Sequence, residues 1–233
     1  MLVDNKFIII MIPRCATTSF LDTCQILNIE TNDVREYGYT NLYKHDIGGV
    51  RYHYSMYALQ EKFGYNYPVI AVKRDKGTAF ISLWKQMIGI LSEAEDGKVY
   101  EILKKLTVDD ILFFNENDYN LLDMEDLIKL SSIFCERIGL EKKEYYVGKF
   151  VLLFKPQEWY HNNDQNIIWF DFKELNKLEE WVTNALGIDF KLVHINSSTN
   201  WESNLKDDEY FREKFDKLYG SRFEEFKKTK TLI

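Results

Sequence analysis

Proline, glycine and cysteine are all scarce in this chain of 233 residues, which contains 3, 11 and 3 of them. The prolines are isolated, so no Pro-rich linker divides the chain, and no Gly/Ser-rich linker is present either. Hydrophobic residues make up 45% and aromatic residues 15% of the sequence, which is typical of a folded protein with a sizeable core. We therefore predict a single domain over residues 1–233.

The cysteines Cys15, Cys24 and Cys135 are odd in number and lack the spacing of metal ligands. Reduced thiols are the simplest state for such a set, which indicates a reducing, cytoplasmic compartment. We accordingly predict no metal site.

Long apolar runs are missing near the N-terminus as well. The run Phe7–Ile12 is interrupted by Pro13 and Arg14 after six residues, too early for a membrane span or a signal-peptide core. We therefore expect no stable membrane insertion. The net charge of −7 argues against a general nucleic-acid partner, although a local basic site for a small anion remains compatible with it.

Apolar segments alternate with amphipathic ones along the chain. The runs Phe7–Ile12 and Val69–Lys73 are short, apolar and β-branched, which predicts buried strands. Further strands are expected at 50–54, 145–157 and 166–172, helices at 17–27, 55–64, 77–91, 124–139, 173–187 and 207–228, and a loop over most of 31–50. This alternation predicts an α/β fold with a three-layer, mostly parallel central sheet flanked by helices.

The turn after the first strand has the composition of an anion site. Arg14 follows the strand, and Thr17, Thr18 and Ser19 stand where the next helix begins. Backbone N–H groups at a helix N-terminus, together with hydroxyls, favour a phosphate-like group. The alternative is that Thr17 or Thr18 merely caps the helix.

The second strand also ends in positive charge, at Lys73 and Arg74. Ligands of parallel α/β sheets bind beyond the carboxyl ends of the strands. If the two strands are neighbours in the sheet, Arg14 and Arg74 face one site. The alternative is that both arginines form ordinary surface ion pairs.

These segments resemble a known family, the sulfotransferases that use 3′-phosphoadenosine 5′-phosphosulfate (PAPS). The segment IPRCATTSF, Ile12–Phe20, is similar to their 5′-phosphosulfate loop. Their 3′-phosphate site has an Arg at a strand end and a Ser eight positions later, which Arg74 and Ser82 match. The segments KPQEWY (Lys155–Tyr160) and HINSS (His194–Ser198) follow in the order seen in carbohydrate sulfotransferases.

The resemblance implies a P-loop-NTPase-like sulfotransferase fold and an enzyme that moves a sulfuryl group from PAPS to an acceptor hydroxyl, with a carbohydrate favoured. The product of the donor would be 3′,5′-adenosine bisphosphate (PAP), and the acceptor a small molecule or a glycan. The sequence leaves the acceptor and the oligomeric state open. The residues that the resemblance assigns to the cofactor are Arg14, Cys15, Ala16, Thr17, Thr18, Ser19, Arg74 and Ser82.

Two residues receive catalytic roles. Arg14 would neutralise charge on the leaving 5′-phosphate. His53 would accept the proton of the acceptor hydroxyl, with His45 and then Glu61 as alternatives. The family usually has Lys at the position of Arg14 and often Gly at the position of Ala16, so altered cofactor geometry or a protein that only binds is an open alternative.

A P-loop nucleotide kinase is the other rival, because strand, turn and helix fit it equally well. The chain lacks the Gly-Lys-Ser/Thr sequence of that loop and a clear Mg²⁺-binding Asp after a second strand. Dependence on Mg²⁺ would distinguish the two enzymes.

Overall fold

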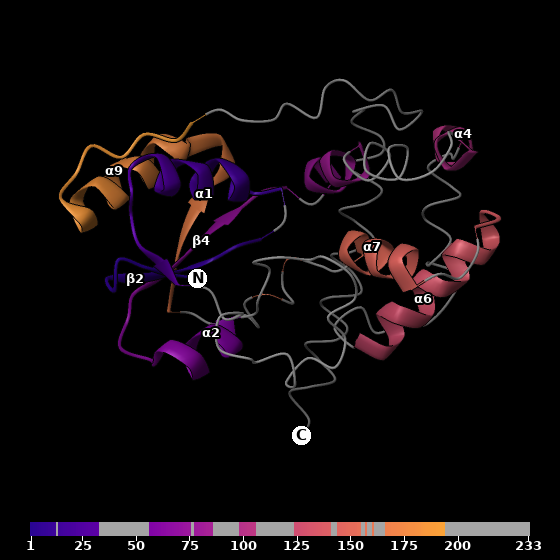
Figure 1. Cartoon of the computed structure of the whole chain (residues 1–233), viewed down its shortest axis with the longest axis horizontal. Coiled ribbons are helices and arrows are strands. Elements are labelled where there is room, and N and C mark those ends of the chain that lie inside the picture. The colour runs from indigo at the N-terminus through magenta and orange to yellow at the C-terminus, as the bar shows by residue number, and fades with distance from the viewer. Residues whose placement is uncertain are drawn as a thin grey trace. The chain divides into compact units, whose positions relative to one another are not determined.

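The computed structural model describes residues 1–12, 14–32, 56–75, 77–85, 98–105, 124–140, 144–154, 157, 160 and 166–193 (Figure 1). The chain divides into two compact units. Unit 1 comprises Met1–Arg74 and Gln157–Asn196, and unit 2 comprises Asp75–Pro156 and Ser197–Ile233. The expectation of one domain stays a prediction.

The strands of unit 1 form a five-stranded sheet in the order β3-β1-β2-β4-β5. Their bounds are Leu2–Val3 (β1), Phe7–Ile10 (β2), Thr31–Asn32 (β3), Val69–Lys73 (β4) and Ile167–Asp171 (β5). β2, β4 and β5 are parallel to one another, whereas β1 is antiparallel to both β2 and β3. The fold is therefore of the α/β class with a mixed sheet, and two of the four pairings depart from the mostly parallel sheet that we expected.

The antiparallel edge arises from a tight turn that sequence analysis missed. Asp4 and Asn5 have positive φ values of 47° and 51°, and the Lys6 N–H donates to the Val3 carbonyl at 2.9 Å. Two left-handed residues inside such a bond are the mark of a hairpin turn that matches the strand twist. Strands as short as β1 and β3 show no periodicity, so the sequence could not reveal them.

The two buried strands that we predicted are confirmed. Every residue of β2 and the first four of β4 are buried on both faces of the sheet, as their unbroken apolar sequence predicted. The parallel register pairs Ile8 with Val69 and Ile10 with Ala71. β2 is shorter than expected, because the chain turns after Ile10, where the Ile12 N–H bonds the Ile10 carbonyl at 3.1 Å.

Among the described residues, three α-helices pack on this sheet: α1 (Thr17–Ile26), α2 (Met56–Phe63) and α9 (Leu175–Leu186), the last preceded by the 3₁₀ helix η4 (Phe172–Glu174). Figure 1 shows α1 and α9 on one side of the strands and α2 on the other. All three α-helices contribute buried side chains to one core with the strands. Gly187 ends α9 in the left-handed conformation, as predicted for its C-cap.

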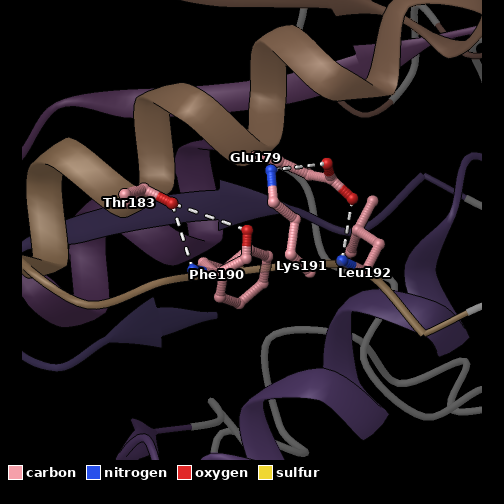
Figure 2. A network of polar contacts seen from close by, with 5 residues as sticks. All are labelled: Glu179, Thr183, Phe190, Lys191 and Leu192. Atoms are coloured by element: carbon pink, nitrogen blue, oxygen red, sulfur yellow. Dashed lines mark hydrogen bonds and ion pairs between the residues drawn. The ribbon is translucent and has the colours of Figure 1, made fainter.

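A segment after α9, residues 189–193, is tied back onto that helix (Figure 2). Thr183 Oγ1 accepts from the Phe190 N–H at 3.1 Å, and the Glu179 carboxylate accepts from the Leu192 N–H at 2.9 Å. The Lys191 ammonium lies 3.4 Å from the same carboxylate. Side chains of α9 thus take the backbone donors of a segment that pairs with no strand among the described residues.

The same segment also reaches α1. Thr23 Oγ1 donates to the Ser19 carbonyl at 2.7 Å and accepts from the Val193 N–H at 2.9 Å. The Phe190 ring lies 5.2 Å from the ring of Phe20. Residues 189–193 therefore join α1 to α9 through both a buried hydroxyl and an aromatic contact.

Unit 2 is helical over its described residues, which comprise a helix at 77–85, α4 (Lys98–Lys105), α6 (Met124–Arg137) and α7 (Glu144–Phe154). The strand predicted over 145–157 is wrong, since α7 occupies most of it. Its buried residues recur at helical spacing: Tyr146, Val147, Phe150, Val151 and Phe154. β-branched and aromatic content suggested a strand, but this spacing of three and four fits a helix face. That face packs on α6, where the Phe134 ring lies 4.8 Å from that of Phe150.

Candidate functional site

The carboxyl ends of β2, β4 and β5 meet at one edge of the sheet, because the three strands are parallel and in register. Arg14 follows β2 after a short turn, Arg74 follows β4 directly, and Phe172 follows β5 directly. The sequence predicts that Arg14 and Arg74 face one site if their strands are neighbours in the sheet. β2 and β4 are neighbours, so this condition is met. This edge is where α/β sheets bind ligands.

The Arg74 side chain joins the three strand ends. Its Nη1 donates to the carbonyl oxygen of Arg14 at 3.2 Å, and its guanidinium carbon lies 4.3 Å from the centroid of the Phe172 ring. A guanidinium held against an aromatic face keeps its charge while losing rotational freedom. Arg74 is therefore a fixed positive charge beside the turn that follows β2.

Gln157 holds the main chain of Arg74 from the other side. Its side-chain Nε2 donates to the Arg74 carbonyl at 2.8 Å, and its Oε1 accepts from the Arg74 N–H at 3.4 Å. Sequence analysis assigned Gln157 no role, although it belongs to the KPQEWY segment that resembles the family. The only sequence feature that pointed to Gln157 was the order of that segment along the chain, and this order carries no information about a contact.

The environment of Arg14 is partly buried and positively charged. Burial is the main cause that lowers the pKa of Arg14, and the charge of Arg74 lowers it further, whereas Cys15 raises it. An arginine starts from so high a pKa that Arg14 stays charged at neutral pH. Two like charges at one edge repel each other, and an oxyanion that contacts both removes this repulsion.

The backbone of the turn is left-handed at two residues that are not glycine. Arg14 and Ala16 both have φ of 61°, and the Cys15 N–H between them donates to the Ile12 carbonyl at 3.2 Å. The left-handed conformation costs an L-residue about 1–2 kcal/mol. Backbone N–H groups exposed by such turns form anion-binding concavities. The Gly that the resemblance leads one to expect at position 16 would adopt this conformation without strain.

Helix α1 begins without a side-chain cap. The N-cap residue is Ala16, and no side chain of the described residues bonds the first N–H groups of the helix. Thr17 is the first helical residue, and its hydroxyl donates backwards to the Ile12 carbonyl at 2.8 Å. Thr18 is exposed. The interpretation of Thr17 or Thr18 as an N-cap is therefore wrong, and among the described residues no side chain takes the first N–H groups of α1.

Two further residues assigned to the cofactor differ in burial: Cys15 is buried, whereas Ser19, in α1, is partly buried. Cys15 is only 4% exposed and belongs to the hydrophobic core, and the Ser19 carbonyl receives the Thr23 hydroxyl. Tyr160 is buried as well, and burial, with a smaller contribution from Cys15, raises its pKa. We therefore expect neither the buried Cys15 side chain nor its N–H, which already donates to the Ile12 carbonyl, to bind an anionic ligand. No disulfide joins the chain's three cysteines, all of which are buried.

The other predicted site residues lie in unit 2, on α2 or outside the described residues. Ser82 is 8% exposed on the helix at 77–85 in unit 2, whereas Arg74 belongs to unit 1, so their joint contact with one phosphate stays a prediction. Glu61 is exposed on α2. His53 and His45 lie outside the described residues.

The part of the chain that the structure describes contains no cluster of three His, Cys, Asp or Glu side chains suited to a metal ion. Within the same ranges, no helix has the length and apolar character needed to cross a bilayer. Comparison of the chain with protein-family models, with curated proteins and with solved structures found no match. The site is accordingly interpreted from its own geometry.

Proposed function

We propose that this protein is a PAPS-dependent sulfotransferase that transfers a sulfuryl group to a hydroxyl of a small-molecule or carbohydrate acceptor. The observation that carries the proposal is the 3.2 Å hydrogen bond from Arg74 Nη1 to the Arg14 carbonyl. This contact joins the two segments that resemble the cofactor-binding motifs of the family, although 60 positions separate the residues.

The charge and the backbone donors of this edge favour a ligand with more than one anionic group. Two arginines and an uncapped helix N-terminus lie at one sheet edge, and α1 has no acidic residue in its first turn. Phosphate and sulfate groups are bound by this combination of guanidinium and backbone N–H donors. A P-loop-like, three-layer sulfotransferase fold is part of the proposal, and the parallel core of β2, β4 and β5 supports it.

In the proposed reaction, a bond forms between the acceptor oxygen and sulfur while the bond from sulfur to the 5′-phosphate oxygen breaks. Arg14 and the first N–H groups of α1 stabilise the charge that develops on the leaving phosphate. Because its hydroxyl proton is donated to Ile12, Thr17 contributes its backbone N–H rather than that proton. His53 takes the acceptor proton, with His45 and Glu61 as the alternatives, and PAP leaves.

Calorimetric titration of the full chain with PAP, AMP and ATP, the last with and without Mg²⁺, tests the proposal. We expect roughly micromolar binding of PAP, weaker binding of AMP and no requirement for Mg²⁺. Arg74→Ala and Arg14→Ala should each weaken PAP binding about 10- to 100-fold, because each removes charge-assisted hydrogen bonds. Arg137→Ala, which changes an exposed arginine on α6, is the matched control and should bind like the wild type.

Transfer of sulfate from PAPS to a panel of sugar and small-molecule hydroxyls then tests catalysis, with PAP release as the readout. Binding of ATP only with Mg²⁺ would support a nucleotide kinase instead. PAP binding without turnover on any acceptor would support a relative that only binds.

A further inference from the structure

The position of Arg74 depends on a residue outside the two segments that carry the proposed cofactor site. Arg74 is the first residue beyond β4, and the last residue pair of the β4–β5 ladder is Lys73 with Asp171. Its N–H and carbonyl groups therefore lie just outside the ladder, where strand pairing no longer supplies their partners. Gln157 supplies both from a single side-chain amide, at a sequence separation of 83 residues.

This pair of bonds determines where the guanidinium can go. Ordering a flexible arginine side chain costs rotamer entropy, so a fixed main chain and a fixed head group both reduce the cost of binding an anion. The main chain of Arg74 is held by Gln157, and its head group by the Phe172 ring and the Arg14 carbonyl. Without Gln157, the main chain of Arg74 would lose these two hydrogen bonds, and its position would depend more on the contacts of the head group.

We propose that Gln157 is a positioning residue, whose amide holds Arg74 in place for the 3′-phosphate of the nucleotide and so sets the preference for PAP over AMP. The inference rests on the proposed function, since it takes the bisphosphate as the ligand. Gln157 itself need not contact the ligand.

The chemistry of the side chain explains why this position needs glutamine. One planar amide offers a donor and an acceptor with the spacing of a backbone peptide, which Arg74 presents in complementary form. Gln157→Met keeps a side chain of similar length but removes both hydrogen bonds. Gln157→Glu keeps an acceptor for the Arg74 N–H, but it sets a carboxylate oxygen against the Arg74 carbonyl.

The first experiment measures PAP and AMP affinities by calorimetry for the wild type, Gln157→Met, Gln157→Glu and the matched control Gln25→Met, which changes an exposed glutamine on α1. We expect the ratio of PAP to AMP affinity to fall about tenfold in Gln157→Met and in Gln157→Glu, because PAP binding weakens while AMP binding is retained. Gln25→Met should keep the wild-type ratio. An unchanged ratio in both Gln157 variants would overturn the proposal. This includes an equal loss of affinity for the two nucleotides, which would indicate general destabilisation.

A second measurement does not depend on nucleotide binding. In protein labelled with ¹⁵N-arginine, the Arg74 Nε–H signal is assigned by its loss in Arg74→Lys, and its shift reports the Phe172 ring current. We expect this signal to move toward that of a solvated arginine in Gln157→Met and to stay in place in Gln25→Met. If the wild type binds neither nucleotide, the proposed function fails, and this signal alone decides whether Gln157 positions Arg74. A signal that Gln157→Met leaves unmoved would show that it does not.

Discussion

Two helices of this protein follow two neighbouring strands, and they begin in opposite ways. After β2, the chain turns through left-handed Arg14 and Ala16, and α1 starts with no side-chain cap. After β4, the Asp75 carboxylate accepts from the Thr78 N–H at 2.8 Å, and the Asp75 carbonyl accepts from the Ala79 N–H at 3.0 Å. The helix at 77–85 therefore carries its own anion, whereas α1 does not.

The difference shows how one acidic side chain decides whether a helix N-terminus is already capped or can bind an external anion. Both N-termini carry the positive end of a helix dipole. An aspartate at the cap neutralises that end and repels a second anion, so the start of the helix at 77–85 is a poor phosphate site. An uncapped start beside two arginines is a good one, provided that α1 is stabilised by other means. Its buried residues Phe20, Thr23 and Cys24 supply that stabilisation through packing.

The largest expected effect comes from giving the start of α1 an acidic cap like that of the helix at 77–85. Ala16→Asp places a carboxylate at the start of α1, in a left-handed conformation that aspartate tolerates. We expect PAP affinity to fall about 100-fold, equivalent to roughly 2.7 kcal/mol, by charge repulsion. Calorimetry measures the affinity, and thermal unfolding monitored by circular dichroism confirms that the variant is folded.

The control for this substitution is Asp75→Asn, which caps as well as aspartate but removes the charge. It should leave both stability and PAP affinity close to those of the wild type. PAP binding that survives Ala16→Asp would place the anion away from the N-terminus of α1.

The next prediction tests whether burial of the Cys24 side chain stabilises α1, through the pH dependence of the free energy of unfolding. Burial raises the pKa of the Cys24 thiol to about 12, from an ordinary value near 9. Between these values the unfolded chain releases the thiol proton while the folded chain retains it, so stability is complete below pH 9 and falls as the pH rises. The expected loss is about 1.4 kcal/mol per pH unit, or roughly 2–3 kcal/mol by pH 11.

Urea unfolding at pH 8, 9, 10 and 11 measures this slope in the wild type and in Cys24→Ala. Titrations elsewhere in the chain are common to both proteins, so the difference between the two curves isolates Cys24. Curves that stay parallel over this range would contradict a buried, neutral thiol.

A smaller effect contrasts the two helix starts directly. Asp75→Ala removes the cap of the helix at 77–85 and should lower the free energy of unfolding by about 1 kcal/mol. Thr18→Ala, at an exposed position in the first turn of α1, should change it by less than about 0.5 kcal/mol, because Thr18 is not the cap. Equal losses in the two variants would mean that Thr18 does support the start of α1.

The smallest effect concerns the backbone strain of the turn between β2 and α1. Ala16→Gly removes the Cβ from a residue at φ 61°, so it should raise the free energy of unfolding by about 0.5–1 kcal/mol, since the relief of strain exceeds the entropy cost of glycine. The measurement is urea unfolding at pH 7, with PAP binding retained. A loss of stability would show that the left-handed conformation at Ala16 is not strained.

Much of unit 1 followed from local sequence. The apolar run of β4, the extent of α1 and the glycine end of α9 were all predicted within one or two residues. β-branched residues and a glycine C-cap act through neighbours along the chain, so their effect can be read without the fold. The prediction failed for α7, where aromatic and β-branched content outweighed the helical spacing of the same residues, and for the two-residue strands β1 and β3.

The site was only partly predictable for the same reason. Arg14 and Arg74 could be selected because each stands just beyond an apolar run, which is a local feature. The left-handed Ala16, the backward bond of Thr17 and the role of Gln157 could not be, since each depends on contacts made after the chain has turned or returned.

The sequence by itself determined that this chain forms an α/β protein, with basic residues just beyond its two apolar runs and hydroxyls at the start of the helix that follows the first run. Hydrophobic periodicity and backbone propensity act over a few residues, so these features need no partner. Tertiary structure alone decided that β2 and β4 are adjacent, that the Arg74 side chain reaches the Arg14 carbonyl, and that Gln157 fixes Arg74. The first of these contacts spans 60 residues, and it forms where the parallel register brings the ends of β2 and β4 to one edge. The second spans 83 residues, and it depends on the return of the segment that contains Gln157 to the end of β4.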